Sequence, residues 1–324
     1  MVTEPAGSGH ILAAIDVGTL TCRLLIAEVS PDGRLHEIRS DRRILRLGQN
    51  VDRDRRLRSD AMHRVAATLK EWRETMDEVN VRSFSVVATS AVRDALNREE
   101  LLDLVKREAH VQIEIISGEE EARRTMLGIR SDVPDDVTDL LAIDIGGGST
   151  ELIGHRLGQP IVARSMDIGV VRLSERILHG DPPTGAEVRQ AREWVSNETR
   201  AAAKDIPLPA GLTFVGTAGT ITSLAAMAQH LPAYDPCRIH KYLLSLEMVN
   251  ELKRQLLTRP KVEREGLPGL ERGREEVIAA GAIILSTIME TLGMAKILVS
   301  DLGLREGLLL DLWSRFPKHA KAEG

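Results

Sequence analysis

Two short stretches decide the fold: Ile15-Asp16-Val17-Gly18-Thr19 and Ile143-Asp144-Ile145-Gly146-Gly147. Each ends a short apolar run, and a second apolar run follows, at residues 24–29 after the first copy and at 151–154 after the second. Two apolar runs joined by a glycine-bearing turn are typical of a β-hairpin. The repeat therefore predicts a chain of two related halves, each with a hairpin near its start.

The other apolar patterns alternate between strands and helices. An apolar stripe at helical spacing predicts a helix capped by Ser59 or Asp60, with members Met62, Val65, Leu69, Trp72, Met76 and Val79. Thr184 and Glu187 form a capping-box signature ahead of a second long helix that reaches about residue 204. Further strands are predicted at 83–89, 112–116, 212–215 and 296–299, and further helices at 99–109, 119–128, 221–229, 246–257, 275–292 and from 304 onward. This order predicts an α/β protein.

Composition excludes several classes of protein. The 324 residues exceed the usual size of one domain, and the formal net charge of -5 creates no global field for nucleic acid or an anionic membrane. Cys22 and Cys237 are far apart and have no metal-ligand companions, which argues against a disulfide framework or a zinc site. The first residues lack a basic signal-peptide region, and the apolar run at 277–285 is too short to span a bilayer. We expect a cytoplasmic, two-domain protein without membrane or nucleic-acid partners.

Three glycine-rich loops have the character of anion sites. The turns at 16–19 and 144–149 bring backbone N–H groups and a hydroxyl into one small volume, beside a carboxylate able to hold a divalent cation. Glycine is expected at 146–148 because the backbone must approach the anion closely. The third loop, Gly216-Thr217-Ala218-Gly219-Thr220, joins a strand to a helix N-terminus, which also favours an anion. Glycine-rich tips and capped turns without a ligand are also common, so one loop alone leaves that alternative open.

Five motifs in order resemble one family. These are Ala-Thr-Ser-Ala-Val-Arg-Asp-Ala at 88–95, Ile-Glu-Ile-Ile-Ser-Gly-Glu-Glu-Glu-Ala at 113–122, Ile-Asp-Ile-Gly-Gly-Gly-Ser-Thr-Glu-Leu at 143–152, the loop at 216–220, and Ser-Asp-Leu-Gly-Leu-Arg-Glu-Gly-Leu-Leu at 300–309. Within the sugar kinase, heat-shock protein and actin superfamily, they resemble the exopolyphosphatase/guanosine pentaphosphate phosphohydrolase (Ppx/GppA) family, in its short form. The resemblance implies two actin-like, ribonuclease H-like domains with a cleft between them. We place domain I at residues 1–125, with a C-terminal helix at 304–324 packing back on it, and domain II at 126–303.

The same resemblance implies roles for individual residues. Glu121 matches the acid that orients and deprotonates the attacking water, whereas Glu119 and Glu120 point elsewhere because consecutive helical residues differ by about 100°. Asp16, Asp144 and Glu151 match the acidic residues around the loops and are the candidates for holding Mg2+ or Mn2+. The implied phosphate-binding residues are Gly18, Thr19, Thr21, Ser90, Arg93, Gly146, Gly147, Gly148, Ser149, Thr217, Gly219 and Thr220. Arg305 and Glu306 are expected to form a structural pair.

Two local features depart from a simple pattern. Leu20 stands where the family carries asparagine, so we expect no polar contact from this side chain, and an activity that is lower or has a different metal dependence. Residues 39–58 contain eight arginines and three aspartates, an excess that either guides a polyanion or belongs to a solvated strand and loop.

The leading hypothesis is an exopolyphosphatase that releases terminal orthophosphate from inorganic polyphosphate with Glu121 as general base. Guanosine pentaphosphate (pppGpp) hydrolysis is the alternative within the family, because both substrates present the same terminal phosphoanhydride. A kinase or ATPase of the superfamily is a second class, and a non-catalytic sensor of polyphosphate or an alarmone is a third. Homodimers are the commonest soluble assembly, and we expect one here.

Overall fold

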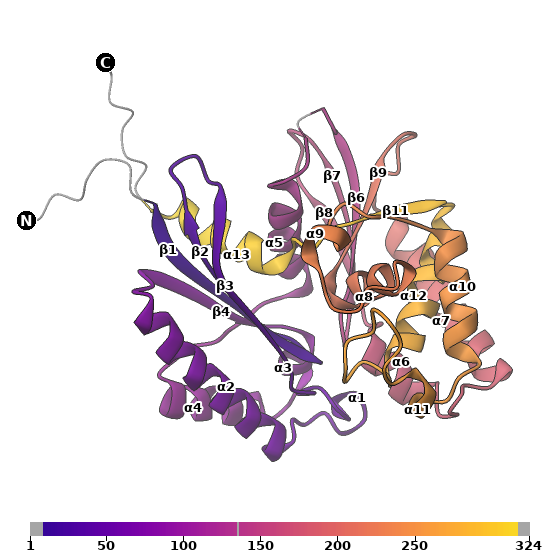
Figure 1. Cartoon of the computed structure of the whole chain (residues 1–324), viewed down its shortest axis with the longest axis horizontal. Helices are drawn as coiled ribbons and strands as arrows, with labels where there is room; N and C mark the ends of the chain where they lie inside the picture. The colour runs from indigo at the N-terminus through magenta and orange to yellow at the C-terminus, as the bar shows by residue number, and fades with distance from the viewer. Residues whose placement is uncertain (1–8, 135, 317–324) are drawn as a thin grey trace, which may run out of the picture.

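Each repeated motif lies at the tip of a β-hairpin in the computed structural model, which describes residues 9–134 and 136–316. The first hairpin joins β1 (His10–Val17) to β2 (Thr21–Val29), and the second joins β6 (Asp139–Ile145) to β7 (Thr150–Arg156). The two hairpins belong to two mixed sheets, and each sheet is the centre of one domain (Figure 1). The predicted repeat is therefore a structural one.

The two sheets share one topology. The first has the order β3-β2-β1-β4-β5, where β3 is Leu35–Ile44, β4 is Ser83–Ala88 and β5 is Glu114–Ile115. The second has the order β10-β11-β9-β6-β7-β8, with β8 at Val162–Met166, β9 at Thr213–Thr217, β10 at Leu243–Ser245 and β11 at Lys296–Val299. In both, the first three strands of the repeat are antiparallel neighbours, and the fourth runs parallel to the first. The chain thus has two actin-like, ribonuclease H-like α/β domains with a cleft between them, as predicted.

Helices cover both faces of the first sheet. α2 (Ser59–Glu78) and α4 (Arg98–Ala109) bury an apolar stripe against one face, and Trp72 is 2% exposed. α13 (Leu304–Ser314), from the far end of the chain, covers the other face with Leu304, Leu308 and Leu309. The short helices α1 (Val51–Asp54) and α3 (Ser90–Asp94) lie toward the second domain (Figure 1).

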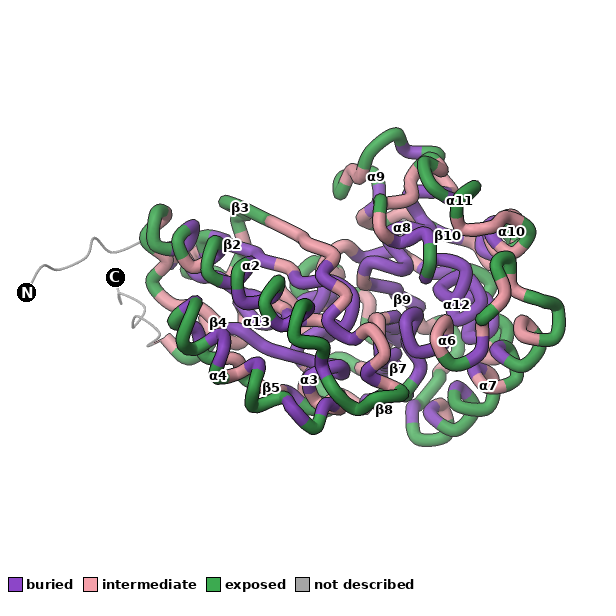
Figure 2. Tube along the Cα trace, turned by 90° about the horizontal axis from the view of Figure 1, so that it is seen from below, coloured by how far each residue is buried: buried purple, intermediate pink, exposed green. Residues whose placement is uncertain are grey.

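The described helices of the second domain range from 4 to 19 residues, and α8 and α12 are the most completely buried. These helices are α6 (Val170–Arg176), α7 (Gly185–Ala203), α8 (Ala218–Ala228), α9 (Pro236–Ile239), α10 (Leu246–Leu257), α11 (Lys261–Arg264) and α12 (Ile278–Leu292). α12 is buried along most of its length and forms the centre of this core (Figure 2). No helix in the described part of the chain is long and apolar enough to cross a bilayer.

Two helices cross where the domains meet. α5 (Gly118–Arg130) packs Ala122, Met126 and Ile129 on the second sheet, while α13 packs on the first, and the two contact each other. The predicted border at 125/126 falls inside α5, and the division into domains at single-residue level stays a prediction. The predicted helix at 304–324 ends at Ser314, and residues 317–324 lie outside the described residues.

Most predicted elements are found, with some differences. α2 has Arg58 as its N-cap with no side-chain cap, so the expected capping by Ser59 or Asp60 is wrong. The strand predicted at 112–116 is confined to Glu114–Ile115. The capping box at Thr184 is present, since its hydroxyl accepts from the Glu187 N–H at 3.3 Å and the Glu187 carboxylate accepts from the Thr184 N–H at 2.7 Å.

Candidate functional site

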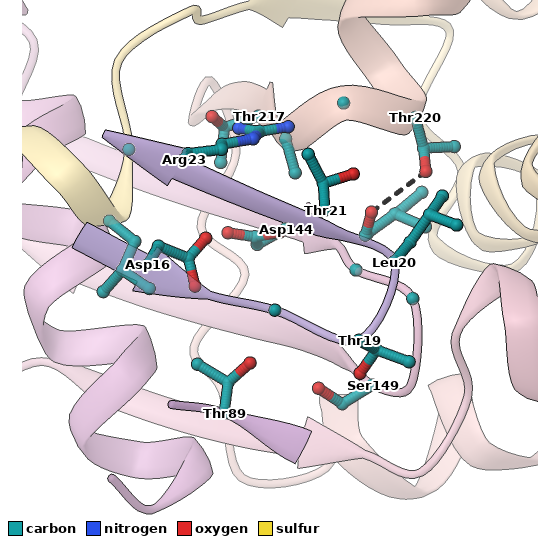
Figure 3. Close-up of a pocket in the computed structure, with 18 of the residues that line it drawn as sticks. Asp16, Thr19, Leu20, Thr21, Arg23, Thr89, Asp144, Ser149, Thr217 and Thr220 are labelled. Carbon is teal, nitrogen blue, oxygen red and sulfur yellow. Dashed lines mark hydrogen bonds between the residues drawn. The ribbon is translucent and has the colours of Figure 1, made fainter. Parts of the chain in front are cut away.

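The tips of the two hairpins meet between the domains. Each tip is closed by the same backbone bond: Gly18 N–H donates to Thr21 at 3.1 Å, and Gly146 N–H donates to Ser149 at 3.0 Å. The side chains of Thr19 and Ser149 lie near each other at this junction (Figure 3). The two loops therefore form one wall of a single interdomain pocket.

The carbonyl groups of both tips turn away from this pocket. In the first tip, Thr19 O accepts from Gly48 N–H at 2.8 Å, and Leu20 O accepts from the N–H groups of residues 45 and 46 at 3.0 and 2.9 Å. In the second tip, the carbonyls of residues 146 and 147 accept from the first turn of α6 at 3.0 and 2.8 Å. A trans peptide is planar, and its N–H points opposite to its C=O. The N–H groups of the residues that follow these carbonyls therefore point toward the pocket. Such N–H groups create an anion-binding concavity.

The close approach of the tips also explains two of the glycines. A Cβ on Gly147 would lie 2.8 Å from the Cβ of Thr19, and one on Gly148 would lie 2.9 Å from the Thr19 hydroxyl oxygen. The expected reason for these glycines, approach to an anion, is therefore incomplete. Here they are required first by the contact between the two domains.

Nearly all the predicted site residues come together in this pocket. Its lining includes, from the predicted set, Asp16, Gly18, Thr19, Thr21, Ser90, Glu121, Asp144, Gly146, Gly147, Gly148, Ser149, Thr217, Gly219 and Thr220. Arg93 and Glu151 lie just behind the lining, and both act electrostatically on Glu121.

Glu121 lies in the first turn of α5, whose N-cap Ser117 accepts from the Glu120 N–H at 3.1 Å. Of the three consecutive glutamates, Glu119 is exposed and Glu120 pairs with Arg123 at 2.8 Å, whereas Glu121 is 8% exposed and faces the pocket. Arg93, from α3, lies 3.5 Å from the Glu121 carboxylate. Burial, followed by the nearby carboxylates of domains I and II, raises the pKa of Glu121 well above its usual value, and Arg93 lowers it.

Asp16 and Asp144 occupy equivalent places in the two hairpins, and Glu151 occupies the place equivalent to that of Arg23. Asp16 faces Arg23 across the first antiparallel pair, and Asp144 faces Glu151 across the second. Burial raises the pKa of Asp16 and of Asp144 to about 6, and burial followed by repulsion from Asp144 raises that of Glu151 to about 8. The Ser165 hydroxyl donates to one oxygen of Glu151 at 2.7 Å.

This donor set suits a hard divalent cation. Asp16 Oδ1 and Glu151 Oε2 are buried without a hydrogen-bond partner, and such orphaned carboxylate oxygens are natural cation ligands. Within residues 9–134 and 136–316, however, no three acidic, His or Cys side chains converge closely enough to form a complete metal site. Mg2+ usually keeps several waters and is held by one or two carboxylates plus substrate phosphates, which matches this arrangement.

Three arginines that line the pocket were not among the predicted site residues. Arg23, Arg274 and Arg305 line it, and a Cβ on Gly219 would collide with the guanidinium groups of the first two. Arg23 and Arg274 converge on the N-terminus of α8, whereas Arg305 donates to Leu24 O and to the Ser40 hydroxyl. The alternation of Thr21 and Arg23 along β2 signalled the position of Arg23. The expected Arg305–Glu306 pair exists at 3.3 Å, but both residues also line the pocket.

The hydroxyls of the third loop have structural partners. Thr220 donates to the carbonyl of residue 145 at 3.0 Å, which links the second and third loops (Figure 3), and Thr217 donates to Leu302 O at 2.9 Å. Ala218 between them has a φ of 69°, an uncommon left-handed conformation for a residue other than glycine. At Thr217 and Thr220, hydroxyl donation to a phosphate would require breaking these bonds.

The arginine-rich segment is largely neutralised within the protein. Arg42, Arg43, Arg46, Arg53, Arg56 and Arg58 each form an ion pair with an acidic side chain, and Arg42 also lies over the Tyr234 ring at 4.5 Å. These contacts favour the reading as a solvated, internally paired strand and loop over a track for a polyanion.

The fold and the pocket define a two-domain actin-like protein whose interdomain cleft is lined by backbone loops, carboxylates and arginines. A model of the Ppx/GppA phosphatase family matches residues 25–316, and this chain belongs to that family. It is 35% identical over 315 residues to exopolyphosphatase 2 of Mycobacterium tuberculosis, covering 93% of this chain and 98% of that protein.

Solved structures agree with this membership. The crystal structure of the Aquifex aeolicus family member has a TM-score of 0.79 at 34% identity, with 95% of this chain and 99% of that chain covered. An exopolyphosphatase from Cytophaga hutchinsonii has a TM-score of 0.85 at 28% identity, with 95% and 99% covered.

Proposed function

We propose that this protein is an exopolyphosphatase that releases the terminal orthophosphate of inorganic polyphosphate. The observation that carries the proposal is the buried carboxylate of Glu121, which faces a pocket lined by two phosphate-type loops. Phosphoanhydride hydrolysis needs a base that can reach an in-line water, together with neutralisation of charge on the phosphoryl group. The naming of relatives as exopolyphosphatases supports the same activity.

In this proposal the outermost phosphate lies at the junction of the two tips. The N–H groups that follow the engaged carbonyls, and the hydroxyls of Thr19 and Ser149, hold its oxygens. Inner phosphates contact Arg23, Arg274 and Arg305, which also line the pocket. Arg23 and Arg305 lie close enough to Asp16 to lower its pKa, so they would neutralise phosphate charge beside the carboxylates.

Glu121 then takes a proton from the attacking water, and Arg93 keeps the carboxylate oriented toward the pocket. Asp16, Asp144 and Glu151 would hold Mg2+, directly or through water. When bound, the cation would neutralise phosphoryl charge and lower the pKa values that burial raises in these carboxylates.

Orthophosphate release from polyphosphates of defined length and from pppGpp, at equal concentrations with Mg2+, Mn2+ or EDTA, tests the proposal. We expect release from polyphosphate with a divalent cation and none with EDTA. Turnover of pppGpp alone would replace polyphosphate with the nucleotide as substrate. Polyphosphate binding without any turnover would favour the sensor, and transfer of ATP phosphate to a small alcohol would favour the kinase class.

Assembly and location stay separate predictions. If the protein is a homodimer, analytical ultracentrifugation should give a mass twice that of the 35.6 kDa chain. A cytoplasmic location predicts recovery in the cytosolic fraction on cell fractionation.

A further inference from the structure

Arg172 of α6 connects the second phosphate loop to the first domain. Its side chain is 8% exposed, and its guanidinium donates in three directions. Nε donates to the carbonyl of Gly148 at 2.9 Å, Nη1 to Asp52 at 2.7 Å and Nη2 to Asp94 at 2.5 Å. A longer contact of 3.5 Å reaches the hydroxyl of Ser90. One planar group therefore bridges both domains.

The contact with Gly148 completes the orientation of the loop. The backbone of α6 already engages the carbonyls of residues 146 and 147, and Arg172 engages the third. Because the peptide is planar, fixing the carbonyl of Gly148 also fixes the N–H of Ser149. This N–H belongs to the group that would face the terminal phosphate.

Through Asp94, Arg172 also binds α3, the helix of the first domain that carries residues of the proposed site. Asp94 ends α3, the five-residue helix that carries Ser90 and Arg93, and Arg93 in turn lies 3.5 Å from Glu121. Movement of α3 relative to the Gly148 loop would shift Arg93 relative to the phosphate that the loop holds. Misplacement of reacting groups by about 1 Å can lower a rate about 100-fold.

We propose that Arg172 is a positioning residue, which holds the Gly148 peptide in register with α3 when the cleft is closed. The proposal rests on the proposed function for its kinetic consequence. It does not require Arg172 to touch the substrate.

Arg176 provides a matched control on the same helix. It also pairs with Asp52, at 2.6 Å, and lies over the Trp194 ring. Its side chain is 46% exposed, however, and among the described residues it forms no hydrogen bond or ion pair with the Gly148 loop or α3. Arg172→Met and Arg176→Met both remove a partner of Asp52. Their difference therefore isolates the contacts with Gly148 and Asp94.

The test measures kcat and KM for phosphate release from polyphosphate, with the melting temperature and the radius of gyration from small-angle scattering. We expect kcat to fall about 100-fold in Arg172→Met with KM changed less than fivefold, because Arg23, Arg274 and Arg305 still bind the substrate chain. Asp94→Asn should lower kcat by more than tenfold, and Arg176→Met should stay within threefold of wild type. If Arg172→Met fails to fold, Asp94→Asn carries the same test.

A kcat for Arg172→Met, or for a folded Asp94→Asn when Arg172→Met does not fold, within twofold of the Arg176→Met value would overturn the proposal. If wild type releases no phosphate, the proposed function fails, and scattering then decides the present inference. An increased radius of gyration in Arg172→Met or Asp94→Asn, but not in Arg176→Met, would support Arg172 as the link between the domains. Equal radii in all of them would overturn it.

Discussion

Thr19 and Gly147 belong to different domains, yet a Cβ on Gly147 would lie 2.8 Å from the Cβ of Thr19. Real Cβ atoms almost never approach so closely, so the missing side chain at residue 147 permits this contact between the hairpin tips. The same contact places the side chains of Thr19 and Ser149 near each other (Figure 3). The closed cleft thus depends on glycine at the tip of one hairpin and on a small hydroxyl residue at the tip of the other.

Gly147→Ala should push the tips apart. We expect the rate of phosphate release to fall at least tenfold, because the two loops no longer hold one phosphate together. The steady-state rate and the melting temperature check this. Gly185→Ala is the control, because a Cβ at this position, at the start of α7, would meet no atom closer than Arg189 at 3.5 Å. Equal rates in the two variants would show that the tip contact is dispensable.

Leu20 packs into the core of the second domain, although it belongs to a hairpin of the first. Its side chain is 6% exposed and joins the apolar cluster that includes Ile143 and Ile221. Leu20→Asn should lower the free energy of unfolding by about 2 kcal/mol, since it loses apolar burial and places an amide there. Urea denaturation measures this, with Leu96→Asn, which replaces a side chain 77% exposed, as control. An unchanged midpoint in Leu20→Asn would mean that Leu20 does not stabilise the closed form.

The crossing of α5 and α13 has room only for glycine. A Cβ on Gly307 would overlap the carbonyl oxygen of Arg124, and one on Gly128 would overlap that of Gly303. Gly307→Ala should therefore reduce the free energy of unfolding by about 1–3 kcal/mol through overpacking. A thermal or chemical melt within 0.5 kcal/mol of wild type would contradict this close crossing.

The capping box at the start of α7 should respond to acid. Hydrogen bonds from the Thr184 N–H and hydroxyl, and others from residues 179 and 180, lower the pKa of Glu187 to about 2. Because the folded pKa is below the usual 4.5, the stabilisation is present above pH 4.5 and is lost as the pH falls toward 2. The stability difference between wild type and Glu187→Gln should shrink over that range in acid titration. If the stability difference between the two proteins does not change with pH, the charge of Glu187 does not contribute to the stability of the capping box.

The sequence predicted those parts of the fold that depend on local patterns. The repeated hairpins, α10 at Leu246–Leu257 and β11 at Lys296–Val299 follow from apolar runs and turn residues, and the structure confirms them. β3 at Leu35–Ile44 was not among the individually predicted strands, because its exposed, arginine-rich sequence has little apolar periodicity. The packing of α5 on the second sheet depends on tertiary contacts that no local pattern encodes.

Some residues of the site could likewise be predicted from the sequence, whereas others depend on tertiary contacts. Loop residues and Glu121 follow from short motifs, whereas Arg274 comes from a loop far along the chain and carries no local signal for its approach to α8. Leu20 was expected to lack a polar contact and to alter activity or metal dependence, whereas its burial in the other domain becomes visible once the two tips are placed together. The role of each site residue stays a prediction that mutation must test.

Glu121→Gln, compared with Glu119→Gln, tests the central claim most directly. The glutamine keeps the size of the side chain and removes its ability to accept a proton, whereas Glu119 is an exposed neighbour on the same turn. Orthophosphate release from polyphosphate should fall about 100-fold to 10,000-fold in Glu121→Gln, with polyphosphate binding retained, and should change less than twofold in Glu119→Gln. A Glu121→Gln enzyme with at least a tenth of the wild-type rate would contradict the assignment of Glu121 as the general base.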